Sequence, residues 1–181
     1  DKVFFTAGSY KYLGAGEGMC FMSVPRGCTL RPLNTGWFAE MAQLENRSEG
    51  VGFGNDWLRF AGATMDYSPL YKALAVLALF ENQGITVDRI HSYVLSNQQR
   101  FLAAMDTADH PLFNRGNLLY HDLENGHGHF FTFHCGSAEK AGQLQEELRL
   151  KHVLCDRRKH LLRLGFAIYH PAEETFERLF T

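Results

Sequence analysis

The chain has 181 residues, a length that typically forms one domain or one domain and part of a second. Its 18 Lys and Arg residues nearly balance its 20 Asp and Glu residues, and the net charge of −2 argues against a nucleic-acid partner and against electrostatic binding to a membrane. Because 45% of the residues are hydrophobic and 21% are charged, the composition is that of a globular protein with a real core. The longest apolar run, residues 73–80, is too short to span a bilayer.

The cysteines and the start of the chain bear on its location and length. The four cysteines form no CxxC pair, which favours reduced thiols, and no basic-then-apolar leader opens the chain. We therefore expect a cytoplasmic protein. The chain opens on an apolar, β-prone segment, residues 3–6, whereas free termini usually fray. We expect the chain to be the C-terminal part of a longer protein.

The first half is predicted to contain two short strands, a long loop and a helix. Residues 3–6 are predicted as a short buried strand and residues 19–24 as a second apolar strand, and a glycine-rich loop, residues 14–18, lies between them. The apolar residues of segment 26–65 follow no regular spacing for long, and this segment is predicted as irregular, packed loop. Ser68 is placed to cap a helix with Pro69 at its first position, apolar residues follow at helical spacing, and Gly84 ends the pattern.

The second half is predicted to be an α/β unit with mixed strand pairing. Thr86 is placed to cap a helix that carries Ile90, Val94, Phe101 and Met105 on one face. The short break over residues 83–85 predicts a hinge between two domains, residues 1–83 and 84–181. The remaining predicted elements are strands over residues 129–133, 153–155 and 161–166, a helix over 138–150, a basic turn over 156–159 and a final helix from Pro171.

Neither a nucleotide-binding loop nor a metal site is favoured by the motifs. The glycines of residues 14–18 lack the GxGxxG spacing and precede a strand rather than a helix, so the dinucleotide fingerprint fails. His127, His129 and His134 could bind zinc together, but no cysteine or carboxylate lies at ligand spacing. Metal binding therefore remains an alternative to ordinary surface imidazoles.

Two charged residues could carry chemistry on the pattern alone. Arg163 lies inside the apolar strand of residues 161–166, where a buried guanidinium needs a carboxylate or phosphate partner. A structural ion pair and a clamp for a substrate carboxylate both remain open. Lys11 follows the first predicted strand between two tyrosines, and a lysine in a partly apolar pocket can become a nucleophile that forms a Schiff base. A solvated lysine is the alternative.

One segment resembles a known family in its sequence as well as in the spacing of its residues. Residues 8–16, with the sequence Gly-Ser-Tyr-Lys-Tyr-Leu-Gly-Ala-Gly, resemble the segment around the pyridoxal-phosphate lysine of kynureninases and their class V aminotransferase relatives. Similar blocks follow in the family's order over residues 36–38, 153–158, 162–164 and 168–170. The likeness covers essentially the whole chain but only the C-terminal part of the family's length. It implies an α/β fold of the PLP-dependent transferase-like type (fold type I), with the end of the large domain in residues 1–83 and a small C-terminal α/β domain in residues 84–181.

The resemblance also implies roles for five residues. Lys11 would form the Schiff base with pyridoxal phosphate (PLP) and move protons at the substrate α-carbon. Tyr10 would contact the cofactor phosphate, and Arg163 would pair with the substrate α-carboxylate. Trp37 would lie near the active site at a dimer interface, and Thr64 would reach the phosphate in the partner subunit. The expected protein is a homodimer.

The expected function is that of a PLP-dependent, class V aminotransferase-like enzyme acting on an amino acid. A kynureninase-like hydrolase is the alternative. It is not the favoured interpretation, because residues 65–69 differ from the Asn-Pro-Pro-like stretch of kynureninases, which puts the residues that select a kynurenine side chain in doubt. Cys155 does not resemble the flexible-loop cysteine of cysteine desulfurases, so that chemistry is not expected. The family's ring-stacking aromatic residue and its aspartate for the pyridine nitrogen lie upstream of the lysine, in sequence that this chain lacks. A non-catalytic fragment or degenerate relative that folds and dimerises without cofactor is therefore the third interpretation.

Overall fold

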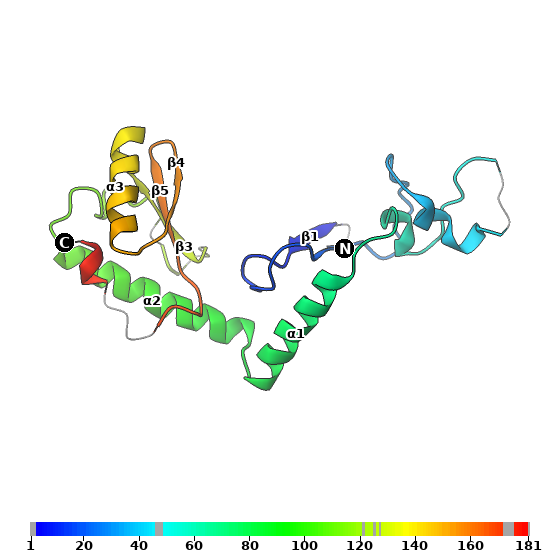
Figure 1. Ribbon diagram of the computed structural model, residues 1–181, viewed down its shortest axis with the longest axis horizontal. Helices are drawn as coiled ribbons and strands as arrows, with labels where there is room; N and C mark the ends of the chain where they lie inside the picture. The colour runs from blue at the N-terminus through cyan, green and yellow to red at the C-terminus, as the bar shows by residue number, and fades with distance from the viewer. Residues whose placement is uncertain are drawn as a thin grey trace. The chain divides into compact units, whose positions relative to one another are not determined.

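The computed structural model describes residues 3–45, 49–120, 122–124, 126, 128–171 and 176–180. The chain divides into two compact units, residues 1–83 and 84–181, and Figure 1 labels their α-helices and most of their strands. Across the described residues, no helix combines the length and the hydropathy needed to cross a membrane.

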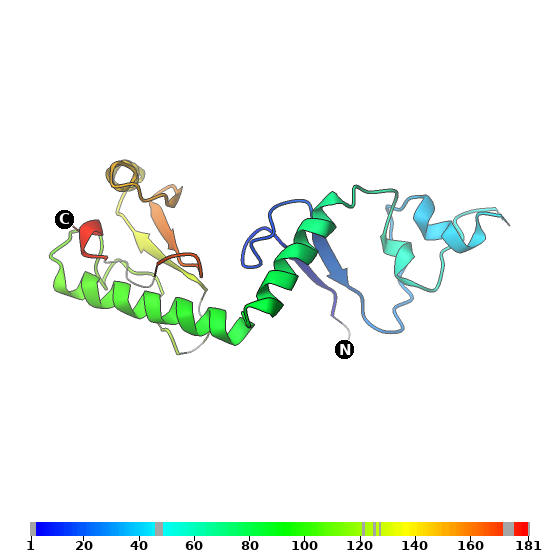
Figure 2. The ribbon, with the colours of Figure 1, turned by 60° about the horizontal axis from the view of Figure 1, so that its bottom comes forward.

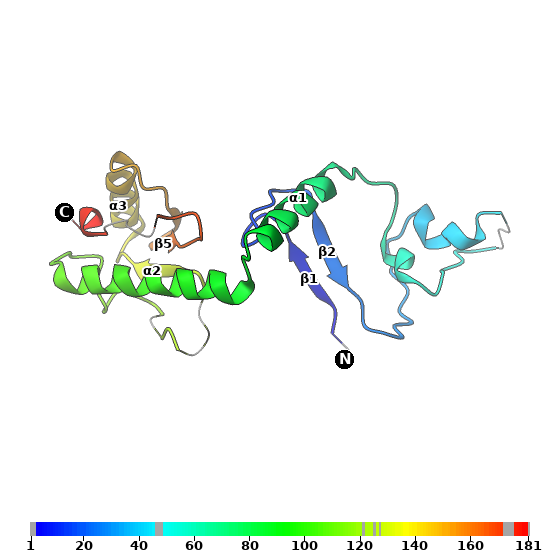
Figure 3. The same ribbon diagram turned by 90° about the horizontal axis from the view of Figure 1, so that it is seen from below.

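The first unit is built on a β-hairpin and one α-helix. Strands β1 (Phe5–Gly8) and β2 (Cys20–Ser23) pair in antiparallel register. Two 3-10 helices follow, η1 (Trp37–Gln43) and η2 (Trp57–Phe60), and then α1 (Ser68–Asn82). Figures 2 and 3 show α1 crossing close to the β1–β2 hairpin.

The prediction of a buried first strand is wrong. The strand begins at Phe5 rather than at residue 3, and the Phe5 side chain is 58% exposed. Strand β2 is exposed along its whole length. A hairpin of two strands provides no second layer to cover its faces, and therefore apolar composition alone does not bury it. The two 3-10 helices were also missed, because residues 26–65 show no helical period.

Helix α1 begins at the Ser-Pro pair, as predicted, but its cap residue lies one position earlier than Ser68. Tyr67 is the cap residue, Ser68 is the first helical residue, and Pro69 lies in the first turn. The Asp66 carboxylate accepts a hydrogen bond from the Ser68 backbone N–H at 2.9 Å. This hydrogen bond, together with one from the Ser68 side chain, lowers the pKa of Asp66. Beyond the helix, Gly84 has a φ of 60°, a left-handed conformation that suits glycine.

The second unit contains two capped helices. The hydroxyl of Thr86 accepts from the Arg89 N–H at the start of α2 (Val87–Thr107), as predicted. The hydroxyl of Ser137 accepts from the Lys140 N–H at the start of α3 (Ala138–Leu150), whose bounds are those predicted. Each cap satisfies a backbone donor that has no partner inside the helix.

The sheet of the second unit differs from the prediction. Its strands are β3 (Phe130–His134), β4 (Asp156–Arg158) and β5 (Leu161–Gly165), in the order β3-β5-β4, and both pairs are antiparallel rather than mixed. Residues 153–155 are not a strand, and most of the predicted basic turn is strand β4. All three side chains of β4 are exposed, so no apolar alternation marks it.

The core of the second unit lies on one face of this sheet. Phe101 of α2 is at its centre, with ring contacts to other buried aromatic residues. The buried residues packed in this core are Val94, Phe101, Leu102, Met105, Phe113, Leu118, Phe131, Phe133, Cys135, Ala141, Leu144, Leu148, Leu162, Leu164, Phe166 and Leu179. Of the predicted final helix, residues 172–175 lie outside the described residues, and Glu177–Leu179 form a 3-10 turn, η3, with Leu179 buried.

Candidate functional site

The Lys11 loop connects β1 to β2 and is closed by hydrogen bonds at Ser9. The Ser9 N–H donates to the Met19 carbonyl at 3.0 Å, and the Ser9 carbonyl accepts from the Ala15 N–H at 3.0 Å. The Ser9 hydroxyl donates to the Gly16 carbonyl at 2.8 Å. Ser9 is buried and Lys11 is exposed, so a fixed base presents the lysine to solvent.

The glycines of the loop allow close packing against α1. Gly16 has a φ of 74°, and a Cβ there would lie 2.3 Å from Lys72 Nζ. Gly18 has a φ of 99°, and a Cβ there would lie 2.6 Å from Cγ of Pro69. A larger residue at either position would therefore strain the backbone, and at Gly18 it would also collide with a rigid proline ring. The glycine pattern is explained by the loop's own packing.

The Lys11 amine is available for chemistry. Its Nζ lies 5.5 Å from the centroid of the Tyr10 ring, and within the described ranges no carboxylate pairs with it. Tyr10 folds back over the strand end, where a Cβ on Gly8 would lie 2.6 Å from the ring. An amine without an acidic partner and a neighbouring phenol fit a group that carries an aldehyde and a phosphate. These residues could therefore hold part of a PLP molecule.

An open, mainly apolar groove of about 780 Å³ begins beside this loop. Tyr10 and Gly8 line it together with Trp57 and Phe60 of the η2 segment. Its other lining residues are Thr6, Ala7, Cys20, Phe21, Met22, Val24, Ala61 and Met65. Trp57 and Phe60 were not predicted as site residues, because the resemblance assigns no role to either position.

Trp37 and Thr64 lie in two segments that contact each other. Trp37 opens η1 and packs edge-to-face on Phe38 at 4.6 Å between ring centroids. The Phe38 N–H donates to the Gly62 carbonyl at 3.0 Å, and a Cβ on Gly36 would lie 2.4 Å from that oxygen. Trp37 is half exposed and Thr64 is exposed. Both side chains can therefore be reached by a ligand or a second subunit.

Arg59 is a buried charge that the sequence analysis missed. It is only 6% exposed, and its guanidinium donates to backbone carbonyls, from Nε to Asp56 at 3.2 Å and from Nη1 to Cys28 at 3.0 Å. It thereby fastens the η2 turn to the loop around residue 28. Hydrogen bonds to carbonyls are one of the ways a protein satisfies a buried guanidinium.

Arg163 lies in the second unit, on the open face of the sheet. Leu162 and Leu164 point into the core, so the intervening Arg163 points away from it. Its Nη2 donates to Asp156 Oδ2 at 2.6 Å, and both side chains are partly exposed. Its guanidinium also lies 5.3 Å from the centroid of the Phe130 ring. The ion pair is therefore a surface pair, and a role in binding a substrate carboxylate stays a prediction.

The other candidates concern metal and thiol chemistry. His127 lies outside the described residues, and in the described part of the chain no three His, Cys, Asp or Glu side chains gather to hold a metal. Burial raises the pKa of the Cys155 thiol to about 11, with a further contribution from the Asp156 carboxylate. Burial also raises the pKa of Cys135. Both thiols stay protonated near neutral pH, which makes them poor nucleophiles.

Comparison with known proteins adds one structural likeness. Neither a protein-family model nor a curated protein matches the chain. Among solved structures, the chain is similar to the cystine C–S lyase C-DES, determined in complex with its reaction product cysteine persulfide, with a TM-score of 0.70 and 17% sequence identity. The likeness covers 95% of this chain and 44% of that one, so the chain spans less than half of the neighbour's length.

At 17% identity the likeness shows the fold alone, and it confirms the α/β fold that the resemblance implied. It does not single out the kynureninases. The assignment of the two units to a large and a small domain remains a prediction.

Proposed function

We propose that the chain is the C-terminal part of a PLP-dependent, class V aminotransferase-like enzyme that acts on an amino-acid substrate. The observation that carries the proposal is the Lys11 loop. Its exposed amine has no acidic partner among the described residues and stands on a hydrogen-bonded base beside an aromatic groove. The α/β fold shared with a cystine C–S lyase supports it.

Each site residue has a distinct task in this proposal. When bound, PLP supplies the electron sink for reactions at the substrate α-carbon. Lys11 would hold the cofactor through its amine and would accept and return a proton at that carbon. Tyr10 and Thr64 would donate hydrogen bonds to phosphate. Thr64 would do so for the cofactor of a partner subunit, and Trp37 would lie near that interface. Arg163 would bind the substrate carboxylate by charge-assisted hydrogen bonds from its guanidinium.

Cleavage of a C–S bond is the second candidate, because the structural neighbour is a cystine C–S lyase. The two candidates differ in their products. Transamination converts an amino acid and a keto acid into the corresponding keto acid and amino acid, whereas the lyase releases cysteine persulfide from cystine. Incubation with cystine, followed by detection of persulfide, separates them. A kynureninase-like hydrolase would instead release anthranilate from kynurenine.

The test of the proposal is reductive trapping. The protein that contains this chain is mixed with PLP, reduced with borohydride and digested, and the modified peptide is identified by mass spectrometry. The chain has six lysines, and Lys11 is expected to carry the label. Lys72 is the matched control, because its amine also lies next to the glycine loop. Lys11→Ala should abolish the label and Lys72→Ala should keep it, whereas labelling of another lysine would refute the assignment.

A further inference from the structure

The open face of the second unit's sheet carries a charged cluster around Arg163. In antiparallel pairs, directly opposed residues share a face. Arg163 is opposed by Asp156 on β4 and by Thr132 on β3, and Phe130 and Arg158 lie two residues further along their strands on the same face. These five residues form the Arg163 cluster.

Asp156 is shared by two arginines. Its Oδ2 accepts from Arg163 Nη2 at 2.6 Å and lies 3.7 Å from Arg158 Nε. One carboxylate therefore faces two guanidinium groups, and the cluster keeps a net positive charge. An anion that arrives at this face is attracted rather than repelled.

The contact with Asp156 uses one nitrogen of Arg163 only. Within the described part of the chain, the Arg163 Nε and Nη1 atoms donate to no acceptor. The Phe130 ring lies 5.3 Å from the guanidinium and supports it from one side. Beyond it, Gly165 opposes Phe130, and a Cβ on Gly165 would meet no atom within 4 Å. The guanidinium is therefore held at one corner, with free donors and open space next to it.

We propose that Asp156 is a positioning residue, which fixes the Arg163 guanidinium so that its free donors receive a substrate carboxylate. This inference rests on the proposed function, and it adds the residue that sets the orientation of the arginine. A flexible arginine must lose side-chain entropy to bind a ligand in one geometry. Asp156 removes part of that cost before the ligand arrives. The negative charge of Asp156 acts in the opposite sense, because it repels the incoming carboxylate.

A pair of neutral variants separates these two effects. Asp156→Asn keeps an oxygen that accepts from Arg163 Nη2, whereas Asp156→Ala removes it, and both remove the charge. The protein that contains this chain, loaded with PLP, is titrated with L-alanine and with ethylamine, and binding is followed by visible absorbance. The affinity for L-alanine divided by the affinity for ethylamine reports the contribution of the carboxylate alone.

The expected ratio is about two- to five-fold larger in Asp156→Asn than in Asp156→Ala, as for one partly exposed charged contact. Asp106→Ala, which removes a similarly exposed aspartate from an arginine pair in the same unit, should leave the ratio unchanged. Equal ratios in the two Asp156 variants, or a larger ratio in Asp156→Ala, would overturn the positioning role. If Arg163→Lys also leaves the ratio unchanged, the proposed substrate role of Arg163 fails instead.

A second measurement does not depend on the cofactor. In the protein that contains this chain, without PLP, the Nε–Hε NMR signal of Arg163 should report restricted motion in the native sequence and in Asp156→Asn, and increased motion in Asp156→Ala. Similar motion in all three proteins would contradict the proposal.

Discussion

Replacing His152 with glycine should stabilise the second unit. His152 follows the C-terminus of α3 with a φ of 60°, in the left-handed region where a Cβ is unfavourable. The backbone around it forms a Schellman motif, because the His152 N–H donates to the Arg149 carbonyl at 3.0 Å and the Val153 N–H donates to the Leu148 carbonyl at 2.9 Å. Glycine is the usual residue at this position.

The size of the effect follows from two opposing terms. The left-handed conformation costs a residue with a Cβ roughly 1–2 kcal/mol, and glycine avoids that cost. Glycine also gains about 0.5–1 kcal/mol of conformational entropy in the unfolded chain, which reduces the benefit. The net expectation is a gain of about 0.5–1 kcal/mol. For a unit of about 100 residues this corresponds to a rise in melting temperature of roughly 2–8 °C.

The melting temperature of the second unit, measured from its unfolding transition by circular dichroism, checks this prediction. Two control variants isolate the cause. His152→Ala removes the imidazole but keeps a Cβ, so it should give no such gain. Lys151→Gly, one residue earlier at a φ of −88°, should lower the stability, because no strain is relieved there. A gain in His152→Ala equal to that in His152→Gly would show that the side chain, and not the backbone, is responsible.

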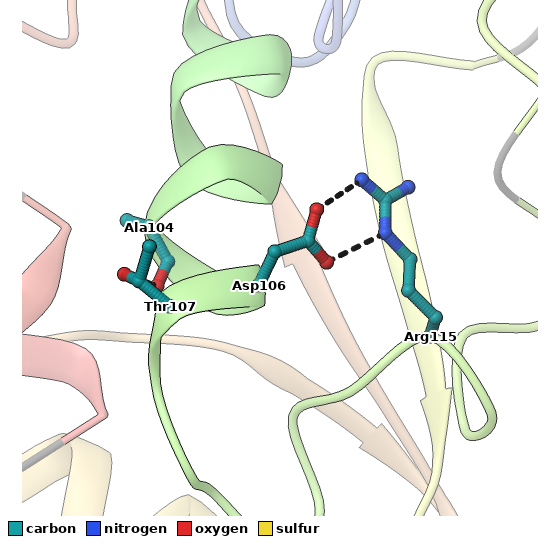
Figure 4. A network of polar contacts seen from close by, with 4 residues as sticks. All are labelled: Ala104, Asp106, Thr107 and Arg115. Atoms are coloured by element: carbon teal, nitrogen blue, oxygen red, sulfur yellow. Dashed lines mark hydrogen bonds and ion pairs between the residues drawn. The ribbon is translucent and has the colours of Figure 1, made fainter.

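Three further predictions address an ion pair, the thiols and association. Asp106 and Arg115 face each other in a bidentate pair (Figure 4), in which Arg115 Nε donates to Asp106 Oδ1 at 2.8 Å and Nη2 donates to Oδ2 at 2.7 Å. Because both side chains are nearly half exposed, Arg115→Gln should lower the free energy of unfolding by at most about 1 kcal/mol, as measured with denaturant. Arg115 lowers the pKa of Asp106, so this contribution should be present at neutral pH and be lost as the pH falls below the ordinary aspartate range; an effect that persists in acid would contradict the pairing. Iodoacetamide at neutral pH should alkylate the exposed Cys20 well before Cys135 and Cys155, as judged by mass spectrometry, and equal rates would refute their burial. The chain should self-associate through the exposed apolar side chains of its first unit, and a clean monomer in sedimentation at high concentration would count against this.

The sequence predicted helices better than strands, for a physical reason that β4 illustrates. Helix α3 has a capping serine, a periodic apolar face and charged residues elsewhere, and its bounds were predicted to the residue. Strand β4 reads Asp-Arg-Arg, and only its hydrogen bonds to β5 make it a strand. An edge strand with no buried side chain has no apolar period, so its place depends on a partner that local sequence does not reveal.

The candidate site shows the same division. Lys11 was found through its flanking sequence, whereas Asp156 and Phe130 become neighbours of Arg163 only through the register of β3, β4 and β5. Arg59 was missed because its partners are backbone carbonyls around residues 28 and 56, which carry no sequence signature. Side chains that act through non-local pairing require the fold before they can be recognised.

The two units differ in how they use their apolar residues, and this difference bears on function. In the second unit the buried core is made of large side chains such as Phe101, Phe131 and Phe133. In the first unit the buried apolar residues among those described are alanines, at positions 15, 39 and 73, while most of the large apolar residues of β1, β2 and α1 remain exposed. Burying an alanine stabilises a fold far less than burying a phenylalanine, because stabilisation grows with the apolar area removed from water. The unit that carries Lys11 therefore leaves large apolar side chains exposed. The Lys11 loop should accordingly be tested in a protein in which these side chains are covered.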